Sequence, residues 1–173
     1  MLEYARRHKD YSFHLEEALY LQPKVLVEYG ATDEARQLAR MANEVRYAVK
    51  RFRAFTRLAV SPHGILSAEV EPEHFIEDLL AEFFARCFPS FSIALSSPRG
   101  TFLAAEGKEL VICRKPLSWL VQDLERTRPK NPLLEPFTEI TPAFWDTFGC
   151  HPLHDAGCPG TLETPPVTRH DHP

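Results

Sequence analysis

Cysteine and histidine gather near the C-terminus, where they offer the ligand types that zinc prefers. Thiolate sulfur and imidazole nitrogen could together complete a tetrahedral site. The residues concerned are Cys150, His151, His154 and Cys158. Their spacing matches no standard structural zinc pattern, and residues 151–173 are rich in Pro, Gly and His without periodicity. We therefore expect 151–173 to be a disordered tail, and we favour this interpretation over a metal site. No cofactor is predicted.

A second group has the composition of an acid–base site. Glu71 and Glu73 flank Pro72 and precede His74. Paired carboxylates beside an imidazole are the ingredients of general acid–base or metal-assisted catalysis. Acidic residues are equally expected at the start of a helix, where they oppose the positive end of its dipole. Glu71, Glu73 and His74 are therefore catalytic candidates only, and the sequence leaves open whether the chain is an enzyme.

Cationic residues concentrate between residues 46 and 58, although the chain carries a formal net charge of −4. Such a chain is not a general polyanion binder, so an anionic partner would have to meet a local patch. Lys and Arg side chains bind phosphates, and an aromatic ring among them could stack on a base. The candidate nucleic-acid contacts are Lys50, Arg51, Arg53, Phe55, Arg57 and Arg99.

The segment before these cations has the pattern of a helix. Thr32 is a suitable N-cap, and apolar residues then repeat at helical spacing. The repeat consists of Ala35, Leu38, Ala42, Val45 and Val49. Basic residues occupy the outer side of this helix, and such a face is commonly just solvated. These basic residues are Arg36, Arg40, Arg46 and Lys50.

From Arg51 the apolar period changes from 3.6 to 2, which predicts a strand through Val60. The turn Ser61-Pro62-His63-Gly64 then suits a type I turn followed by a left-handed glycine, and a return strand follows over 65–71. In the resulting register Arg57 faces Glu69, Phe55 faces Glu71, and Leu58 faces Ala68. Arg57 could therefore be one half of a cross-strand ion pair. Lys50, Arg51 and Arg53 have no acidic residue opposite them in this hairpin.

The remaining pattern predicts the rest of an α+β fold. A helix is expected from Pro72 to Cys87, strands over 91–95, 101–105 and 109–113, a helix from Leu117, and a short helix from Thr141. This gives an antiparallel or mixed sheet of about five strands with a β-β-α-β-β-β core. We expect helices packed on one face, flanked by N- and C-terminal helices. Residues 1–150 are predicted to form a single domain.

The location follows from what the chain lacks. No apolar run approaches the roughly 20 residues of a membrane span, and the first residues carry charges where a signal peptide would be apolar. Its four cysteines do not make a disulfide framework. We expect a cytoplasmic protein without a membrane partner. The oligomeric state is not predicted.

Several short motifs, in order, resemble a known family. These are R-F-R-A-F-T-R-L (51–58), E-P-E-H (71–74), F-F-A-R-C-F (83–88) and a turn containing Arg99. Over residues 33–113 the chain resembles an uncharacterised bacterial family described as DNA metabolism proteins. That family also occurs fused to uracil-DNA glycosylase domains and is found near a radical-SAM protein linked with DNA repair. The chain departs from it at 105–107, which read A-E-G, and at a degenerate K-N-P over 130–132.

Three functions follow as hypotheses. The first is an accessory module of DNA metabolism that contacts DNA through the basic strand and holds DNA or a repair enzyme, with a glycosylase-type or radical-SAM protein as the implied partner. The second is a non-catalytic module that docks an acidic protein on the same residues. The third is an enzyme using Glu71, Glu73 and His74, which requires those side chains to converge in a pocket.

Overall fold

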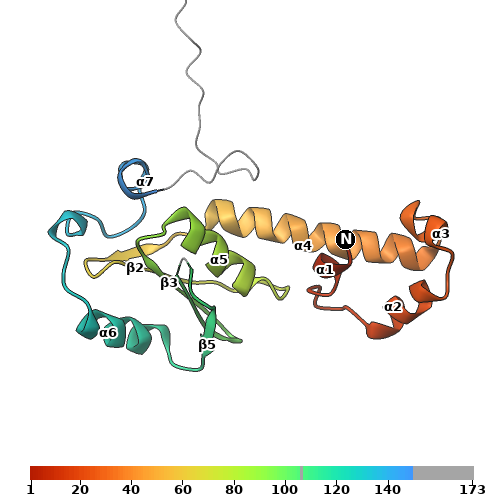
Figure 1. Cartoon of the computed structure of the whole chain (residues 1–173), viewed down its shortest axis with the longest axis horizontal. Coiled ribbons are helices and arrows are strands. Elements are labelled where there is room, and N and C mark those ends of the chain that lie inside the picture. Colours follow the sequence, from red (N-terminus) through yellow and green to blue (C-terminus); the bar gives the residue numbers. More distant parts are fainter. Residues whose placement is uncertain (106, 150–173) are drawn as a thin grey trace, which may run out of the picture.

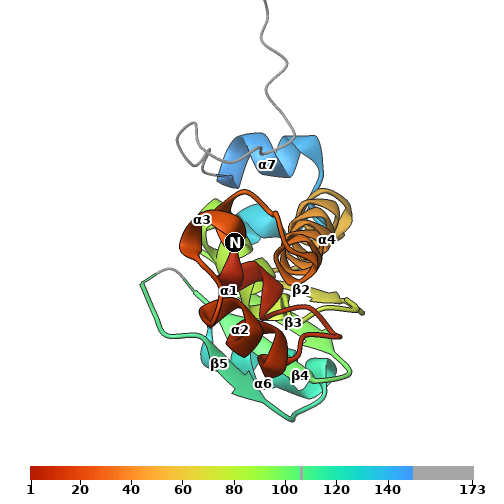
Figure 2. The same cartoon turned by 90° about the vertical axis from the view of Figure 1, so that its right-hand side faces the viewer.

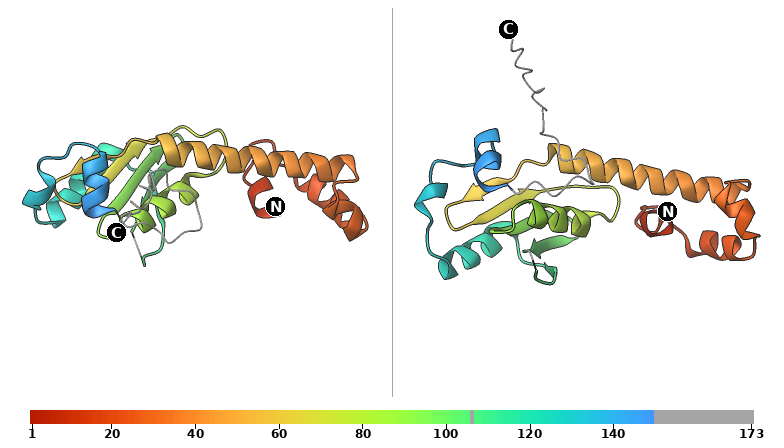
Figure 3. Two further views of the ribbon diagram at one scale, coloured as in Figure 1. Left: turned by 90° about the horizontal axis from the view of Figure 1, so that it is seen from above. Right: turned by 45° about the horizontal axis from the view of Figure 1, so that its top comes forward.

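One long helix, α4 (Asp33–Phe55), runs along most of the molecule (Figure 1). The computed structural model describes residues 1–105 and 107–149. Three short helices, α1 (Leu2–Ala5), α2 (Phe13–Tyr20) and α3 (Lys24–Glu28), lie beside the first half of α4, and the sheet lies toward its C-terminal end (Figure 3). The apolar stripe of α4 serves both parts. Leu38 and Met41 pack with the short helices, whereas Val45 and Val49 pack with the sheet.

The start of α4 is as predicted. Thr32 is the N-cap, and its Oγ1 accepts a hydrogen bond from the Ala35 N–H at 3.2 Å. Asp33 and Glu34 occupy the first turn, where their charges favour the helix dipole.

The predicted strand from Arg51 is wrong, because α4 continues to Phe55. Phe52 explains the difference. Phe52 and Ala54 are two residues apart, which is the apolar spacing of a strand. Phe52 also lies seven residues after Val45, which is the apolar spacing of a helix. In the structure Phe52 packs against the core formed by Val45, Val49 and the sheet, so the helical reading prevails. Arg and Ala in this stretch are also good helix formers.

The hairpin that follows is shorter than predicted but has the predicted register. Strands β1 (Ala59–Ser61) and β2 (Ile65–Glu69) pair with Val60 opposite Leu66. Gly64 has a φ of +73°, and its N–H donates to the Ser61 carbonyl at 3.0 Å, as the turn requires. The ladder stops at Ala59, so residues 55–58 do not pair with 68–71 as strands.

The sheet is mixed, with the order β1-β2-β3-β4-β5. Strands β3 (Ser92–Ser97), β4 (Gly100–Ala104) and β5 (Val111–Cys113) form an antiparallel set. β2 and β3 are parallel, and the crossover between them carries α5 (Glu77–Cys87). The predicted fold class, an α+β protein with a five-stranded mixed sheet and helices at both ends of the chain, is confirmed.

Two details of that prediction need correction. First, α5 starts at Glu77 and not at Pro72, because the preceding segment is held by other groups: Arg99 donates to the carbonyls of Pro72 and His74. Second, helices cover both faces of the sheet. Alternate residues of β3 point to opposite faces, so Ile93 joins the core with α5, α4 and α7 (Pro142–Phe148) while Ala94 packs with α6 (Leu117–Thr127). Figure 2 shows α7 and α4 on one side and α6 on the other.

The segment between α6 and α7 closes the edge of the sheet. It contains a 3-10 turn, Pro132–Leu134. The Val60 N–H donates to the Thr138 carbonyl at 2.9 Å, and the Ile140 N–H donates to the Leu58 carbonyl at 3.1 Å. These bonds occupy the open side of β1, where an unpaired edge would otherwise invite association.

Candidate nucleic-acid interface

The continuous helix places the cations of α4 on one exposed face. Residues three and four apart share a face of a helix, and residues 36, 40, 43, 47, 50 and 51 follow this spacing. All six are exposed, whereas the opposite side of α4 is buried in the core. At about 1.5 Å per residue, the set extends over about 22 Å. We call it the basic face of α4: Arg36, Arg40, Asn43, Tyr47, Lys50 and Arg51.

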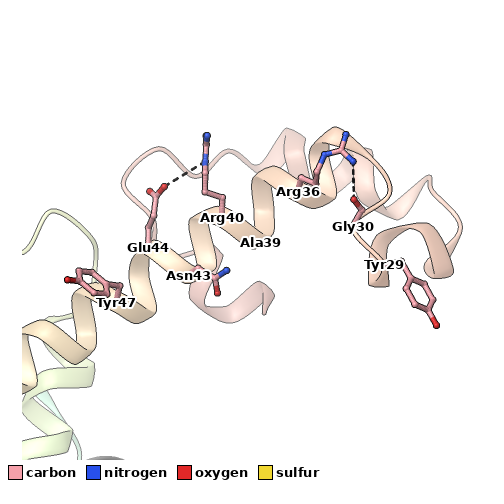
Figure 4. A pocket seen from close by; sticks show the side chains of 8 residues that line it. All are labelled: Tyr29, Gly30, Arg36, Ala39, Arg40, Asn43, Glu44 and Tyr47. Atoms are coloured by element: carbon pink, nitrogen blue, oxygen red, sulfur yellow. Dashed lines mark hydrogen bonds and ion pairs between the residues drawn. The ribbon is translucent and has the colours of Figure 1, made fainter. Parts of the chain in front are cut away.

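The first half of the basic face borders an open hollow (Figure 4). Tyr29 lies at the end near α3 and Tyr47 at the other end, with the two arginines between them. Arg36 Nη1 donates to the Gly30 carbonyl at 3.1 Å, and Arg40 Nε lies 3.7 Å from Glu44 Oε1. The Arg40–Glu44 pair is exposed, and pairs of this kind contribute about 0–1 kcal/mol. Arg36 also pairs with Asp33, whose side chain is 93% exposed, so both arginines can exchange exposed partners for a phosphate at small cost.

The second half of the basic face borders another hollow, where α4 ends. Arg51, Phe55 and Arg57 line it together, with Glu69 and Glu71 also contributing. Phe55 is 79% exposed. The expected ion pair between Arg57 and Glu69 is wrong: within the described residues, neither side chain forms an ion pair. Arg51, Phe55 and Arg57, predicted as contacts, are thus brought together by the structure.

Arg53 lines a different hollow from Arg51, and Phe55 and Arg57 border that hollow as well. On a strand Arg51 and Arg53 would share a face, but two helical residues rotate the direction by about 200°. The Arg53 guanidinium carbon lies 4.4 Å from the centre of the Phe83 ring, and the half-buried side chain lines a hollow with Trp145. Arg53 therefore contributes a cation–π contact between α4 and α5.

Arg99 is directed toward the segment before α5. Its Nε donates to Glu77 Oε1 at 2.6 Å, and its Nη2 donates to the carbonyls of Pro72 and His74, both at 2.7 Å. The guanidinium also lies 4.7 Å from the centre of the Phe75 ring. Arg99 lines neither of the hollows beside the basic face, and its contacts fix the position of residues 72–77.

The three catalytic candidates do not converge. Glu71 lines the hollow beside Arg51. Glu73 pairs with Lys9 at 2.9 Å on the surface, with 69% of its side chain exposed. His74 is buried. The side chains thus lie in three different surroundings and do not form one pocket.

The surroundings of His74 were not predicted from the sequence. Its ring lies 4.5 Å from that of His8, and His8 Nε2 lies 2.8 Å from Glu44 Oε2. These three residues have ligand atoms within 4.8 Å of one another, and their types could hold a metal ion. No short motif indicates such a cluster, because its members come from three segments far apart in the sequence.

The hydrogen bonds around the histidines favour a metal-free link. The Asp10 N–H donates to His8 Nδ1 at 3.1 Å, and the Lys9 N–H makes a longer, 3.4 Å contact with His74 Nδ1. A neutral imidazole whose Nδ1 accepts carries its proton on Nε2. His8 Nε2–H then donates to Glu44, and a protonated nitrogen has no lone pair for a metal. The cluster therefore joins the segment after α1 to α4 and to the segment before α5.

Burial also makes His74 sensitive to pH. Burial lowers the pKa of His74 below its ordinary 6.5; His8 and Lys9 lower it further, while Glu73 and Glu44 oppose the shift. Below pH 6.5, His74 therefore binds a proton more readily in the unfolded chain than in the folded protein. The stabilising contribution is complete above pH 6.5 and is lost as the pH falls toward the lower folded pKa.

We therefore expect the free energy of unfolding to fall between pH 7.5 and 5.5, and to fall less steeply in His74→Gln. Urea unfolding at both pH values measures the difference. The matched control is His14→Gln, because 92% of the His14 side chain is exposed. Equal pH dependence in His74→Gln and the wild type would show that His74 does not carry the effect.

The predicted metal ligands Cys150, His151, His154 and Cys158 lie outside the described residues. Within 1–105 and 107–149, no helix is long and apolar enough to cross a lipid bilayer.

Together these features define an α+β protein in which a long helix displays cations beside a mixed sheet. The chain belongs to the DUF4130 family, a domain of unknown function, whose family model matches residues 7–148. The match runs from the segment after α1 into the end of α7, well beyond the expected core of 33–113. No curated protein matches the chain. No solved structure matches it either.

Proposed function

We propose that this protein binds nucleic acid through the basic face of α4, as an accessory module of DNA metabolism. The observation that carries the proposal is the alignment of Arg36, Arg40, Lys50 and Arg51 along one exposed face of a single helix. A rigid helix presents these cations at fixed spacing, so little conformational freedom of the backbone is lost on binding. The resemblance of residues 33–113 to DNA metabolism proteins supports the same function.

Two of the cations are immediately available for phosphates. Among the described residues, Lys50 and Arg51 form no ion pair, whereas Arg36 and Arg40 have only exposed partners. Phosphate contacts release counterions, so affinity should fall steeply with salt. Four contacts correspond to a slope of log K against log salt of about −2.8 for single strands and about −3.6 for duplex DNA.

The structure of the site supports holding DNA more than transforming it. Glu71, Glu73 and His74 do not converge, so these three candidates do not form an acid–base site in one pocket. Under this proposal the protein delivers DNA to a separate enzyme, and a glycosylase-type or radical-SAM repair protein is the partner that the resemblance implies.

The test is DNA binding by the double variant Lys50→Gln/Arg51→Gln. We expect the affinity for a labelled oligonucleotide at about 50 mM salt to fall at least about tenfold. The salt slope between about 50 and 200 mM should become shallower by about 1.4 for a single strand and by about 1.8 for a duplex. Fluorescence anisotropy measures both. The control is Arg86→Gln/Lys130→Gln, which removes two exposed charges outside the basic face.

An equal loss in both double variants would indicate a general charge effect and contradict the proposed interface. Absence of binding at about 50 mM salt would contradict the function itself. Capture of an acidic protein that depends on Lys50 and Arg51, without DNA binding, would instead identify a protein-docking module.

A further inference from the structure

Three exposed aromatic rings accompany the cations along α4. Tyr29 is 84% exposed, Tyr47 is 70% exposed and Phe55 is 79% exposed. Tyr29 and Tyr47 border the first hollow with Arg36 and Arg40 (Figure 4), and Phe55 borders the second with Arg51. Tyr47 thus lies between the cations of the basic face, while Tyr29 and Phe55 lie at its two ends. Exposed rings gain free energy when another flat surface covers them.

A base offers such a surface only when it is unpaired. In a duplex the faces of the bases are covered by their neighbours, and proteins reach only the base edges in the grooves. In a single strand the bases can be splayed apart and stacked on aromatic side chains, at about 1–3 kcal/mol per base. Tyr47 is well placed for this, because it lies in the middle of the cations.

Acidic residues limit the width of the cationic surface. Glu44 lies beside Asn43 at the edge of the basic face and borders the first hollow. Glu69 and Glu71 border the second hollow on the side of β2. A duplex carries a second phosphate strand, which would approach these carboxylates unfavourably. The narrow row of cations therefore suits one nucleic-acid strand better than a duplex.

From these two observations we infer that the ligand of this face is single-stranded DNA, an inference that rests on the proposed function. Phosphates would lie along Arg36, Arg40, Lys50 and Arg51, with an unpaired base on Tyr47. The roughly 22 Å that these cations span suits the smallest single-strand sites, which hold about four nucleotides.

Anisotropy titrations with labelled (dT)15 and with a blunt 15-base-pair duplex test the inference. We expect wild-type protein to bind (dT)15 at least about tenfold more tightly than the duplex, and Tyr47→Leu to weaken (dT)15 binding about tenfold with little effect on the duplex. Tyr47→Phe keeps the ring and should recover most of the loss. Tyr20→Leu is the matched control, because Tyr20 is 78% exposed on α2, outside both hollows.

Each other outcome is decisive. Equal or tighter binding of the duplex, or a (dT)15 affinity unaffected by Tyr47→Leu, overturns the single-strand inference; if binding still depends on Lys50 and Arg51, the proposed function survives. Binding of neither probe overturns both. Thermal melting of each variant separates a binding defect from misfolding, and we expect unchanged melting for Tyr47→Leu because the side chain is exposed.

Discussion

Replacing Arg99 by alanine is expected to lower the free energy of unfolding by about 3 kcal/mol, which urea unfolding at pH 7.5 would measure. Arg99 donates to Glu77, whose side chain is 3% exposed, and to the carbonyls of Pro72 and His74. Without Arg99, the hydrogen bond from Ser97 Oγ is the only one that the Glu77 carboxylate keeps among the described residues. Removing one partner of a buried pair costs about 3–5 kcal/mol. The lower end applies here, because a third of the Arg99 side chain is exposed and water screens the pair.

Two further variants separate the charge from the geometry. Arg99→Lys should recover only part of the stability, since one ammonium cannot reproduce the fork that reaches Glu77 and two carbonyls together. The double variant Glu77→Gln/Arg99→Ala should be more stable than Arg99→Ala alone, because it no longer buries an uncompensated charge. A loss below about 1 kcal/mol for Arg99→Ala would mean that this contact is no stronger than an ordinary surface pair.

Phe144→Ala is expected to cost about 3–5 kcal/mol, the usual range for emptying a core phenylalanine site. Phe144 is fully buried, and the centre of its ring lies 5.8 Å from that of Phe88, 5.2 Å from Phe137 and 4.9 Å from Phe148. The change therefore removes the most buried of the three aromatic side chains by which α7 contacts the core, the others being Trp145 and Phe148. Equilibrium unfolding gives the magnitude, and Trp145 fluorescence should shift toward that of exposed tryptophan if α7 loosens.

Phe55→Ala is the matched control for this effect. Phe55 carries the same side chain, but it is 79% exposed at the end of α4, so its loss should change the stability by at most about 0.5 kcal/mol. It should nevertheless weaken binding of single-stranded DNA if the proposed interface is correct. If Phe144→Ala destabilised the fold no more than Phe55→Ala, α7 would not be an integral part of the core.

Local rules were sufficient for much of the scaffold. Thr32 begins the long helix because its hydroxyl caps a free N–H, and Gly64 closes the hairpin because it adopts a positive φ at no steric cost. Both depend on neighbours within a few residues. Alternating and helical apolar patterns then placed the strands and α6 and α7 close to where they lie, so the fold class was predictable.

The candidate site was less predictable, because its geometry depends on whether residues 51–55 are helix or strand. The sequence supports both periods around Phe52, and packing of that ring against the core decides for the helix. The consequence is large: Arg51 stays on the exposed face, whereas Arg53 turns toward Phe83. Tyr47 already lies with Arg36, Arg40 and Lys50 in the predicted part of the helix, and the continuation of α4 adds Arg51 to their exposed face.

By itself, the sequence determined an α+β chain with a capped long helix, a tight hairpin and a local excess of positive charge in an acidic protein. The tertiary structure decided how that charge is used. Arg99 forms an ion pair with Glu77 at the start of α5, and His8 contacts both Glu44 and His74, which are far from it in the sequence. Contacts over such separations arise when the apolar faces are buried together, and no local pattern of residues specifies them.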